Sequence, residues 1–324
     1  MNETAADSPL PVTDRAIFQR DVAPHDLIAR CGGPPPWRNF SDPARRALEL
    51  GQHYLPTDDE IRLVNAALFL RRPLLVKGKP GTGKSTLARA VAWQLKLGEV
   101  LVWPITSRSA LQQGLYHYDA IGRMQDGAPG QSPEIGRYLR LGPLGTAFQT
   151  STEERPRVLL IDEIDKSDID LPNDLLNLFE EGEFEIPELS RLPRGERFDH
   201  VSVGLHKSQE KTDIERGIVR CGGFPLVILT SNGERDFPPA FLRRCLRLDI
   251  NEPSPDELKK IVRSRLGITD VQEPLIDSLI EKFGAQAKTG PMATDQLLNA
   301  VFVVTRQLAA LDGPEVEKIL RTLT

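Results

Sequence analysis

The stretch GKPGTGKS, residues 78–85, combines residue types and a spacing that suit the binding of phosphate. It matches the pattern G-x-x-x-x-G-K-S/T, with a strand-like run before it and a helical pattern after it. Glycines let backbone N–H groups close around phosphate oxygens, and the N-terminus of the following helix adds positive potential. The alternative is a glycine-rich turn that matches by chance. The residues expected to bind a nucleotide are Gly78, Pro80, Gly81, Thr82, Gly83, Lys84, Ser85 and Thr86.

An acidic pair in RVLLIDEIDKS, residues 157–167, is the natural partner of such a loop. The apolar run predicts a buried strand that ends in Asp162 and Glu163, at the edge of a parallel sheet where a phosphate loop also lies. We expect Asp162 and Ser85 to hold Mg²⁺, and Glu163 to orient and polarise an attacking water. The second acid is what points to hydrolysis rather than to binding alone. In the alternative interpretation, Glu163 and Asp165 are solvated loop charges.

A polar tip ends another apolar run, LVILTSN, at residues 226–232. In a doubly wound sheet this tip lies beside the strand of the acidic pair and near the γ-phosphate. The amide of Asn232 is placed there to hydrogen-bond both the water and the phosphate. The alternative is a plain turn after a strand.

Two adjacent arginines, Arg243 and Arg244, stand directly before the strand-like LRLDI of residues 246–250. Arginine is among the least buried residue types, and a buried arginine pair needs a carboxylate or a phosphate as its partner. One interpretation is that an acid of the same chain, such as Asp249, supplies the carboxylate. The other is that the partner is a phosphate.

These residues require a sheet that brings them together. Between about residues 56 and 251, apolar runs alternate with helical patterns, which predicts an α/β fold with a parallel sheet covered on both faces. After residue 251 the pattern is helical throughout, and Ser254 and Glu257 form a capping box for the first of these helices. The strand candidates are residues 73–78, 99–106, 157–162, 225–231 and 246–250, and the later helices lie near 274–287, 294–311 and 314–323.

Composition limits the class of protein. The chain has 324 residues and a formal net charge of -5, which gives no general attraction to nucleic acid. The odd number of cysteines, Cys31, Cys221 and Cys245, and their spacing predict reduced thiols. No signal peptide and no apolar run long enough to span a membrane are evident, so we expect a cytoplasmic protein.

Taken in order, the phosphate loop, acidic pair, polar tip, arginine pair and C-terminal helices resemble the AAA+ ATPases over about residues 56–324. The resemblance implies a P-loop NTPase core with a five-stranded parallel sheet and a small all-α lid, with ATP and Mg²⁺ as cofactors. It also implies a homo-oligomer, typically a hexameric ring, in which Arg243 or Arg244 acts as a finger in the neighbouring subunit's site. The expected parts are an N-terminal extension (1–55), the core (56–251) and the lid (252–324).

Within AAA+, the GPL segment before the acidic pair and the sequences after it are similar to the MoxR-like proteins. Inserts near residues 107–148 and 187–222 fit this group, and the second would form a hairpin with a charged tip. The resemblance implies remodelling of a separate protein partner, often one with a von Willebrand A domain. Tyr116, His117 and Tyr118 would then contact the substrate, unless they pack the insert itself.

One departure concerns the lid. The family often has a basic sensor 2 residue at the start of the third lid helix, where this chain has Met292, Ala293 and Thr294, with Lys288 at the wrong offset. Two other functions stay open, the first because AAA+ proteins include such motors and the second because of this missing basic residue. One is a nucleic-acid motor or loader, and the other is a nucleotide-gated scaffold in a defence or stress system.

Overall fold

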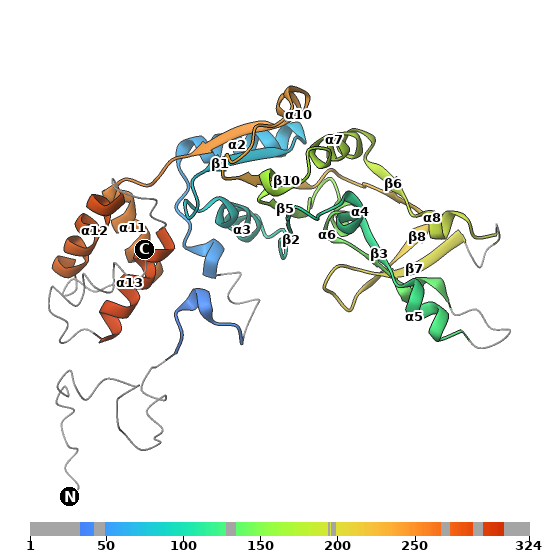
Figure 1. Cartoon of the computed structure of the whole chain (residues 1–324), viewed down its shortest axis with the longest axis horizontal. Helices are drawn as coiled ribbons and strands as arrows, with labels where there is room; N and C mark the ends of the chain where they lie inside the picture. Colours follow the sequence, from blue (N-terminus) through green and yellow to red (C-terminus); the bar gives the residue numbers. More distant parts are fainter. Residues whose placement is uncertain are drawn as a thin grey trace, which may run out of the picture. The chain divides into compact units, whose positions relative to one another are not determined.

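The computed structural model of the chain describes residues 33–41, 49–127, 134–193, 195, 199–266, 273–287 and 294–307. Two units make up the chain. The larger comprises Tyr54–Lys79 and Gly83–Asn251, and the smaller comprises Met1–His53, Pro80–Thr82 and Glu252–Thr324. Figure 1 shows the two β-sheets of the larger unit and the C-terminal helices of the smaller one.

Sheet A of the larger unit has five strands, all parallel, in the order β11-β1-β10-β5-β2. This order places β10 between β1, which leads into the phosphate loop, and β5, which ends in the acidic pair. The five-stranded parallel sheet expected from the sequence is confirmed, with strand ends within two residues of the predicted ones. The strands are β1 (Leu74–Gly78), β2 (Leu101–Pro104), β5 (Val158–Asp162), β10 (Leu226–Ser231) and β11 (Leu246–Ile250).

Helices cover both faces of sheet A. Successive residues of a strand point to opposite faces, so each buried strand contributes side chains to both layers. On β1, Leu75 joins one hydrophobic cluster, while Leu74 and Val76 join the other. All three side chains are fully buried, which explains why the strands read as continuous apolar runs. The helices of this core are α2 (Asp58–Leu70), α3 (Lys84–Gln94), α6 (Pro143–Thr150), α7 (Leu171–Glu181) and α10 (Pro239–Arg244), and η5 (Ile164–Lys166) follows β5.

Sheet B has six strands, in the order β3-β4-β7-β8-β9-β6, and joins the two predicted inserts with β6, which precedes the second insert. The hairpin with a charged tip is formed by β7 and β8, which pair antiparallel. The strands are β3 (Tyr116–Tyr118), β4 (Leu139–Leu141), β6 (Glu183–Glu185), β7 (His200–Gly204), β8 (Lys211–Glu215) and β9 (Ile218–Arg220). The short helices beside it are α4 (Leu111–Leu115), α5 (Ala120–Gln125), η4 (Ile135–Tyr138) and α8 (Pro187–Ser190).

The aromatic residues of β3 pack the insert, so the expectation that all three side chains contact a substrate is wrong. Tyr116 is buried, and its hydroxyl donates to Glu188 Oε2 at 2.9 Å. Burial and this hydrogen bond raise the pKa of the Tyr116 phenol to about 12. Tyr118 packs against the same core, and only His117, which alternates with the two tyrosines, is exposed.

The C-terminal helices of the smaller unit enclose a core of their own. Leu258 and Val262 of α11 pack with Leu279 of α12 and Leu297 of α13. The expected capping box is present, since Ser254 and Glu257 exchange hydrogen bonds. The helices are α11 (Pro255–Leu266), α12 (Glu273–Ala287) and α13 (Thr294–Gln307), and the helix expected at 314–323 lies outside the described residues.

Part of the N-terminal extension belongs to this helical unit. Trp37, in the 3-10 helix η3 (Pro36–Arg38), donates its indole N–H to Asn299 Oδ1 at 3.0 Å. Its ring also lies edge-on to Phe302, with 5.8 Å between ring centroids. The proline-rich segment therefore docks on α13 rather than running free.

In the described part of the chain, Cys221 and Cys245 are free thiols, as expected, and Cys31 lies outside it. Over the same residues, no helix has the length and apolar character needed to cross a membrane.

Substituting Trp37→Ala tests the docking of the extension. We expect it to lower the free energy of unfolding of the helical unit by about 2 kcal/mol, because a half-buried indole and its hydrogen bond are lost. Amide hydrogen exchange in α13 should become faster. Phe69→Ala, in the larger unit, removes an aromatic ring that is 86% exposed and should change nothing in α13. Unchanged exchange in the Trp37 variant would contradict the docking.

Candidate functional site

The phosphate loop joins the end of β1 to the start of α3, which begins at Lys84. Gly81 and Gly83 have φ angles of 78° and 95°, in the left-handed region that other residues adopt only with strain. A Cβ atom on Gly83 would also lie 3.2 Å from the ring of Tyr54. Pro80 and Thr82 flank Gly81 in the loop, and Thr86 lies in the first turn of α3. The backbone shape that cradles phosphate therefore depends on glycine at these positions.

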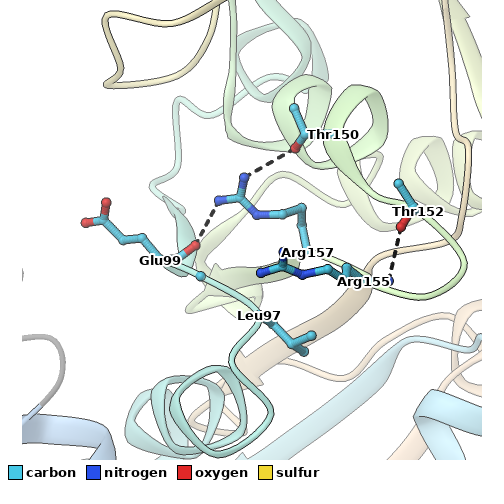
Figure 2. Close-up of a pocket in the computed structure, with 7 residues that line it drawn as sticks. Leu97, Glu99, Thr150, Thr152, Arg155 and Arg157 are labelled. Carbon is cyan, nitrogen blue, oxygen red and sulfur yellow. Dashed lines mark hydrogen bonds between the residues drawn. The ribbon is translucent and has the colours of Figure 1, made fainter.

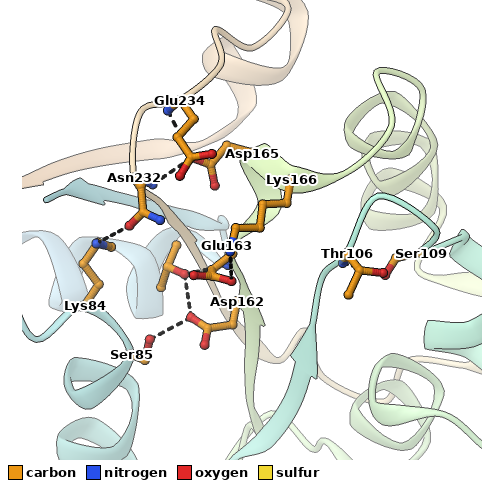
Figure 3. Close-up of polar contacts among 11 residues, drawn as sticks. Lys84, Ser85, Thr106, Ser109, Asp162, Glu163, Asp165, Lys166, Asn232 and Glu234 are labelled. Atoms are coloured by element: carbon orange, nitrogen blue, oxygen red, sulfur yellow. Dashed lines mark hydrogen bonds and ion pairs between the residues drawn. The ribbon is translucent and has the colours of Figure 1, made fainter. Parts of the chain in front are cut away.

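Lys84 is buried and surrounded by neutral acceptors. Its Nζ donates to Gly78 O at 2.7 Å and to Lys79 O at 2.8 Å. It also donates to Asn232 Oδ1 at 2.8 Å, as Figure 3 shows. Burial lowers the pKa of the ammonium group, and the charges of Asp162, Asp165 and Glu163 oppose that shift. A cation with no carboxylate within hydrogen-bond distance is available to an incoming phosphate.

Asp162 is linked to the phosphate loop and to the neighbouring strand by two hydroxyl groups. Its Oδ1 accepts from Ser85 Oγ at 2.7 Å and from Thr230 Oγ1 at 2.6 Å. Oxygen ligands of this kind suit Mg²⁺, which usually takes one or two carboxylates and completes its shell with water and substrate phosphates. The described residues contain no cluster of three or more acidic, histidine or cysteine groups that would hold a metal alone. Ser85 and Asp162 therefore fit a metal ion that arrives with a nucleotide.

Glu163 occupies a strained turn. Its φ of 62° is left-handed, and its backbone N–H donates to Thr230 Oγ1 at 2.9 Å. The carboxylate is half-exposed and pairs with Lys166 Nζ at 2.7 Å, which raises the pKa of that lysine. Outliers of this kind persist only where the surroundings determine them, and they gather at functional sites. Glu163 is thus open to water, and Lys166 is its partner in the structure.

Asp165 has a role that the sequence interpretation missed, and it is not a solvated loop charge. It is buried, and its Oδ2 accepts the backbone N–H groups of Asn232 at 2.9 Å and of Glu234 at 3.2 Å. Its Oδ1 is also buried and has no hydrogen-bond partner. The carboxylate holds the tip of β10 in place beside the acidic pair. A third acid two residues after Glu163 was the available signal.

Arg243 and Arg244 lie at the opposite end of sheet A. They end α10, just before β11, and Leu246 of β11 pairs with Leu74 at the start of β1. The phosphate loop follows the other end of β1, so five residues of strand, or about 16 Å, separate the arginines from it. The structure does not bring them to the nucleotide site of their own chain.

The two arginines also differ from each other. Arg244 forms an ion pair with Glu180 of α7, so an acid of the same chain does supply a partner, although it is not Asp249. Arg243 is exposed and makes no hydrogen bond or ion pair with the described residues. Of the residues at the sensor 2 position, Thr294 opens α13, whereas Lys288, Met292 and Ala293 lie outside those residues.

Comparison with known proteins gives one family. Residues 73–245, which include the phosphate loop, the acidic pair and both arginines, match the model described as AAA domain (dynein-related subfamily). No curated protein matches the chain. Among solved structures, the chain is similar to domain III of the replication initiation protein DnaA from Thermotoga maritima. The identity is 15%, the TM-score is 0.42, and the match covers 85% of this chain and 96% of that one, which is too loose to support any argument about function.

Thr230→Val tests the hydroxyl that joins the two acidic residues. The change keeps the shape of the side chain but leaves Asp162 and the Glu163 N–H without their shared partner. Because a hydrogen bond to a charged group contributes about 1.5–3 kcal/mol, we expect Mg²⁺-dependent binding of ATP to weaken about tenfold or more. Titration with a fluorescent ATP analogue measures the effect. Thr146→Val removes a similarly buried hydroxyl from α6 and should bind ATP normally. Normal binding by the Thr230 variant would rule out this role.

Proposed function

Because the chain belongs to the AAA domain family, in its dynein-related subfamily, it is an ATPase, and we propose that it works as a ring whose subunits complete one another's nucleotide sites. The ring is a homo-oligomer, most simply a hexamer, of the MoxR-like type. Mg²⁺-dependent hydrolysis of ATP drives conformational changes that remodel a separate protein partner. The position of the arginine pair is the observation that carries the proposal.

The direction of the strands supports a shared site. Arg243 and Arg244 stand at the amino edge of sheet A, and the phosphate loop of the same chain stands at its carboxyl edge. An exposed guanidinium such as that of Arg243 is suited to a phosphate on another molecule. In a head-to-tail ring, the amino edge of one subunit meets the nucleotide of the next. Arg243 is the better candidate for the finger, because Arg244 already pairs with Glu180.

The remaining groups act within one chain. Lys84 exchanges its hydrogen bond with Asn232 for oxygens of the β- and γ-phosphates, and the Asn232 amide then becomes free to contact the γ-phosphate. Glu163 orients a water against the γ-phosphorus and takes up its proton as the bond to the bridging oxygen breaks, which leaves ADP and phosphate. Asp165 keeps Asn232 in position through the backbone.

Ser85 and Asp162 would hold the Mg²⁺ that accompanies ATP, and that ion would neutralise phosphate charge. In the structure, Ser85 Oγ donates to Asp162 Oδ1 at 2.7 Å, so the two oxygens lie side by side. Thr230 keeps Asp162 at that position from the neighbouring strand.

The proposed partner is a protein that binds at sheet B. The β7–β8 hairpin ends in a tip whose Lys207 and Glu210 are exposed, and it extends from the core on two strands. This supports an insert that faces the central pore of a ring or a bound protein. A protein with a von Willebrand A domain is the partner that the MoxR-like resemblance suggests. The net charge of -5 argues against a nucleic-acid motor.

Glu163→Gln tests the hydrolytic role. The amide cannot take up the proton of the attacking water, so we expect kcat for ATP hydrolysis to fall by about 10²–10⁴-fold while ATP binding is kept. Release of phosphate and equilibrium binding of ATP are measured on the same preparation. Glu154→Gln changes an exposed acid that precedes β5, at the end of the strand away from Glu163, and serves as the matched control. A Glu163 variant that turns over at the normal rate would remove the residue from this role.

Mixing two inactive variants tests the shared site. One chain carries Arg243→Ala and Arg244→Ala, and the other carries Lys84→Ala. The first keeps its phosphate loop and the second keeps its arginines, so a mixed ring contains complete sites. With random mixing of equal amounts, about one quarter of the sites are complete, and activity should return to about that fraction. No recovery, although mixed rings are seen by native mass spectrometry, would contradict the proposal.

The single variants separate the two arginines. Arg243→Ala should lower kcat by about 10³–10⁵-fold, as loss of an arginine finger does in related phosphoryl transfers. Arg244→Ala should have a smaller effect on kcat, because Arg244 forms an ion pair with Glu180 of its own chain. The opposite order of effects would assign the finger to Arg244.

A further inference from the structure

A second pocket with a positive lining lies at the amino edge of sheet A, away from the nucleotide site. Its volume is about 400 Å³, and Arg155, Arg157, Thr150 and Thr152 line it above Leu97 (Figure 2). Arg157 directly precedes β5, whose other end carries Asp162. Five residues of strand therefore separate this pocket from the acidic pair, or about 16 Å. The pocket is distinct from the site described above.

Arg157 carries a half-buried charge that only neutral groups contact. Its Nη2 donates to Glu99 O at 3.0 Å, and its Nη1 donates to Thr150 Oγ1 at 3.4 Å. Its Nε is buried and has no hydrogen-bond partner. Burial lowers the pKa of the guanidinium, and the charges of Glu99 and Glu210 oppose that shift. A buried charge of this kind is costly unless an opposite charge pairs with it.

Arg155 adds a second guanidinium to the lining of the pocket. It is exposed, and its Nη2 donates only to the carbonyl of Lys96, at 3.3 Å. Among the described residues, no carboxylate forms an ion pair with Arg155 or Arg157. Figure 2 shows the Glu99 carboxylate directed away from both guanidinium groups, which contact only the backbone and hydroxyl oxygens around them.

The surroundings extend the positive charge. Arg71, which follows α2 at the same edge of the sheet, donates its Nη2 to Glu153 O at 2.8 Å, two residues before Arg155. Arg72 is exposed beside it. Neither makes a salt bridge with the residues that the structure describes. Several arginines at one edge attract an anion more strongly than a single one does.

We propose that this pocket binds a phosphate group, either as the free ion or as part of a small metabolite. Two guanidinium groups match a phosphate monoester, which carries about −1.5 to −2 charges at neutral pH, better than they match a single carboxylate. The hydroxyl of Thr152 accepts the Arg155 N–H at 3.1 Å, so its own proton remains available to a phosphate oxygen. This inference does not depend on the proposed ring.

Titration calorimetry with inorganic phosphate tests the pocket. The Lys84→Ala chain is used, so that the phosphate loop contributes less. We expect one saturable site per chain, and about tenfold or more weaker binding when Arg157→Lys or Arg155→Met is added, because each loses charge-assisted hydrogen bonds. Arg137→Met removes an exposed arginine near sheet B and should leave binding unchanged. Circular dichroism of each variant confirms that it is folded.

Two further titrations identify the source and the chemistry of the anion. Glycerol phosphate that binds more tightly than phosphate indicates a small metabolite, and the reverse order indicates the free ion. Acetate that binds as tightly as phosphate would overturn the assignment to phosphate. So would binding that does not saturate, or binding that Arg157→Lys and Arg155→Met leave unchanged. ATP binding is also measured on a chain that carries Arg157→Lys and keeps Lys84. Normal ATP binding by this chain shows that a change in phosphate binding concerns the pocket and not the nucleotide site.

Discussion

The position of β10 between β1 and β5 decides which groups meet at the nucleotide site. Because the three strands are parallel, their carboxyl ends all lie at the same edge of the sheet. From that position Asn232 reaches Lys84 on one side, and Thr230 reaches Asp162 on the other. A single strand thus joins the phosphate loop to the acidic pair through two hydrogen bonds. A strand at an edge of the sheet has one neighbour, so from there β10 could make only one of these two contacts.

The same constraint separates the arginines from the site. Strands that run in one direction have all their preceding loops at the opposite edge, so the loop before β11 faces away from the phosphate loop of its own chain. Arg243 and Arg157 both stand at this amino edge, one before β11 and one before β5. The two proposals give each a partner from outside the sheet, namely the nucleotide of a neighbouring subunit for Arg243 and a bound anion for Arg157.

Internal contacts hold the reactive groups of the nucleotide site in the structure. Lys84 donates hydrogen bonds to carbonyl and amide oxygens, and Glu163 forms an ion pair with Lys166. Both arrangements are easily exchanged, because the Lys84 contacts are to neutral acceptors and the Glu163 pair is half-exposed. An exposed ion pair contributes only about 0–1 kcal/mol, so the pair with Lys166 is a small barrier to catalysis.

The sequence predicted the parts that depend on local pattern. Continuous apolar runs such as 158–161 gave the five buried strands, the spacing of Gly83 and Lys84 gave the phosphate loop, and Ser254 with Glu257 gave a helix start. These signals lie within a few residues of the structure that they predict, and local propensity and burial act in the same direction.

The parts that depend on distant pairing could not be predicted. Sheet B unites the two inserts through a single parallel contact between Arg140 and Gly204, 64 positions apart, which no local pattern announces. The pairing of Arg244 with Glu180 has the same separation. The alternative interpretation made Asp165 a solvated loop charge, whereas it is buried and accepts backbone N–H groups that follow β10. In each case the partner comes from a different element, and only the tertiary fold brings the two together.

Arginine groups contributed by a neighbouring copy are the central claim, and the concentration dependence of ATP hydrolysis tests it most directly. Activity per chain and molecular mass are measured on the same dilutions, the latter by mass photometry. The account predicts that activity per chain rises as oligomers form and approaches zero where the monomer predominates. Full activity per chain from a solution of monomers would contradict it.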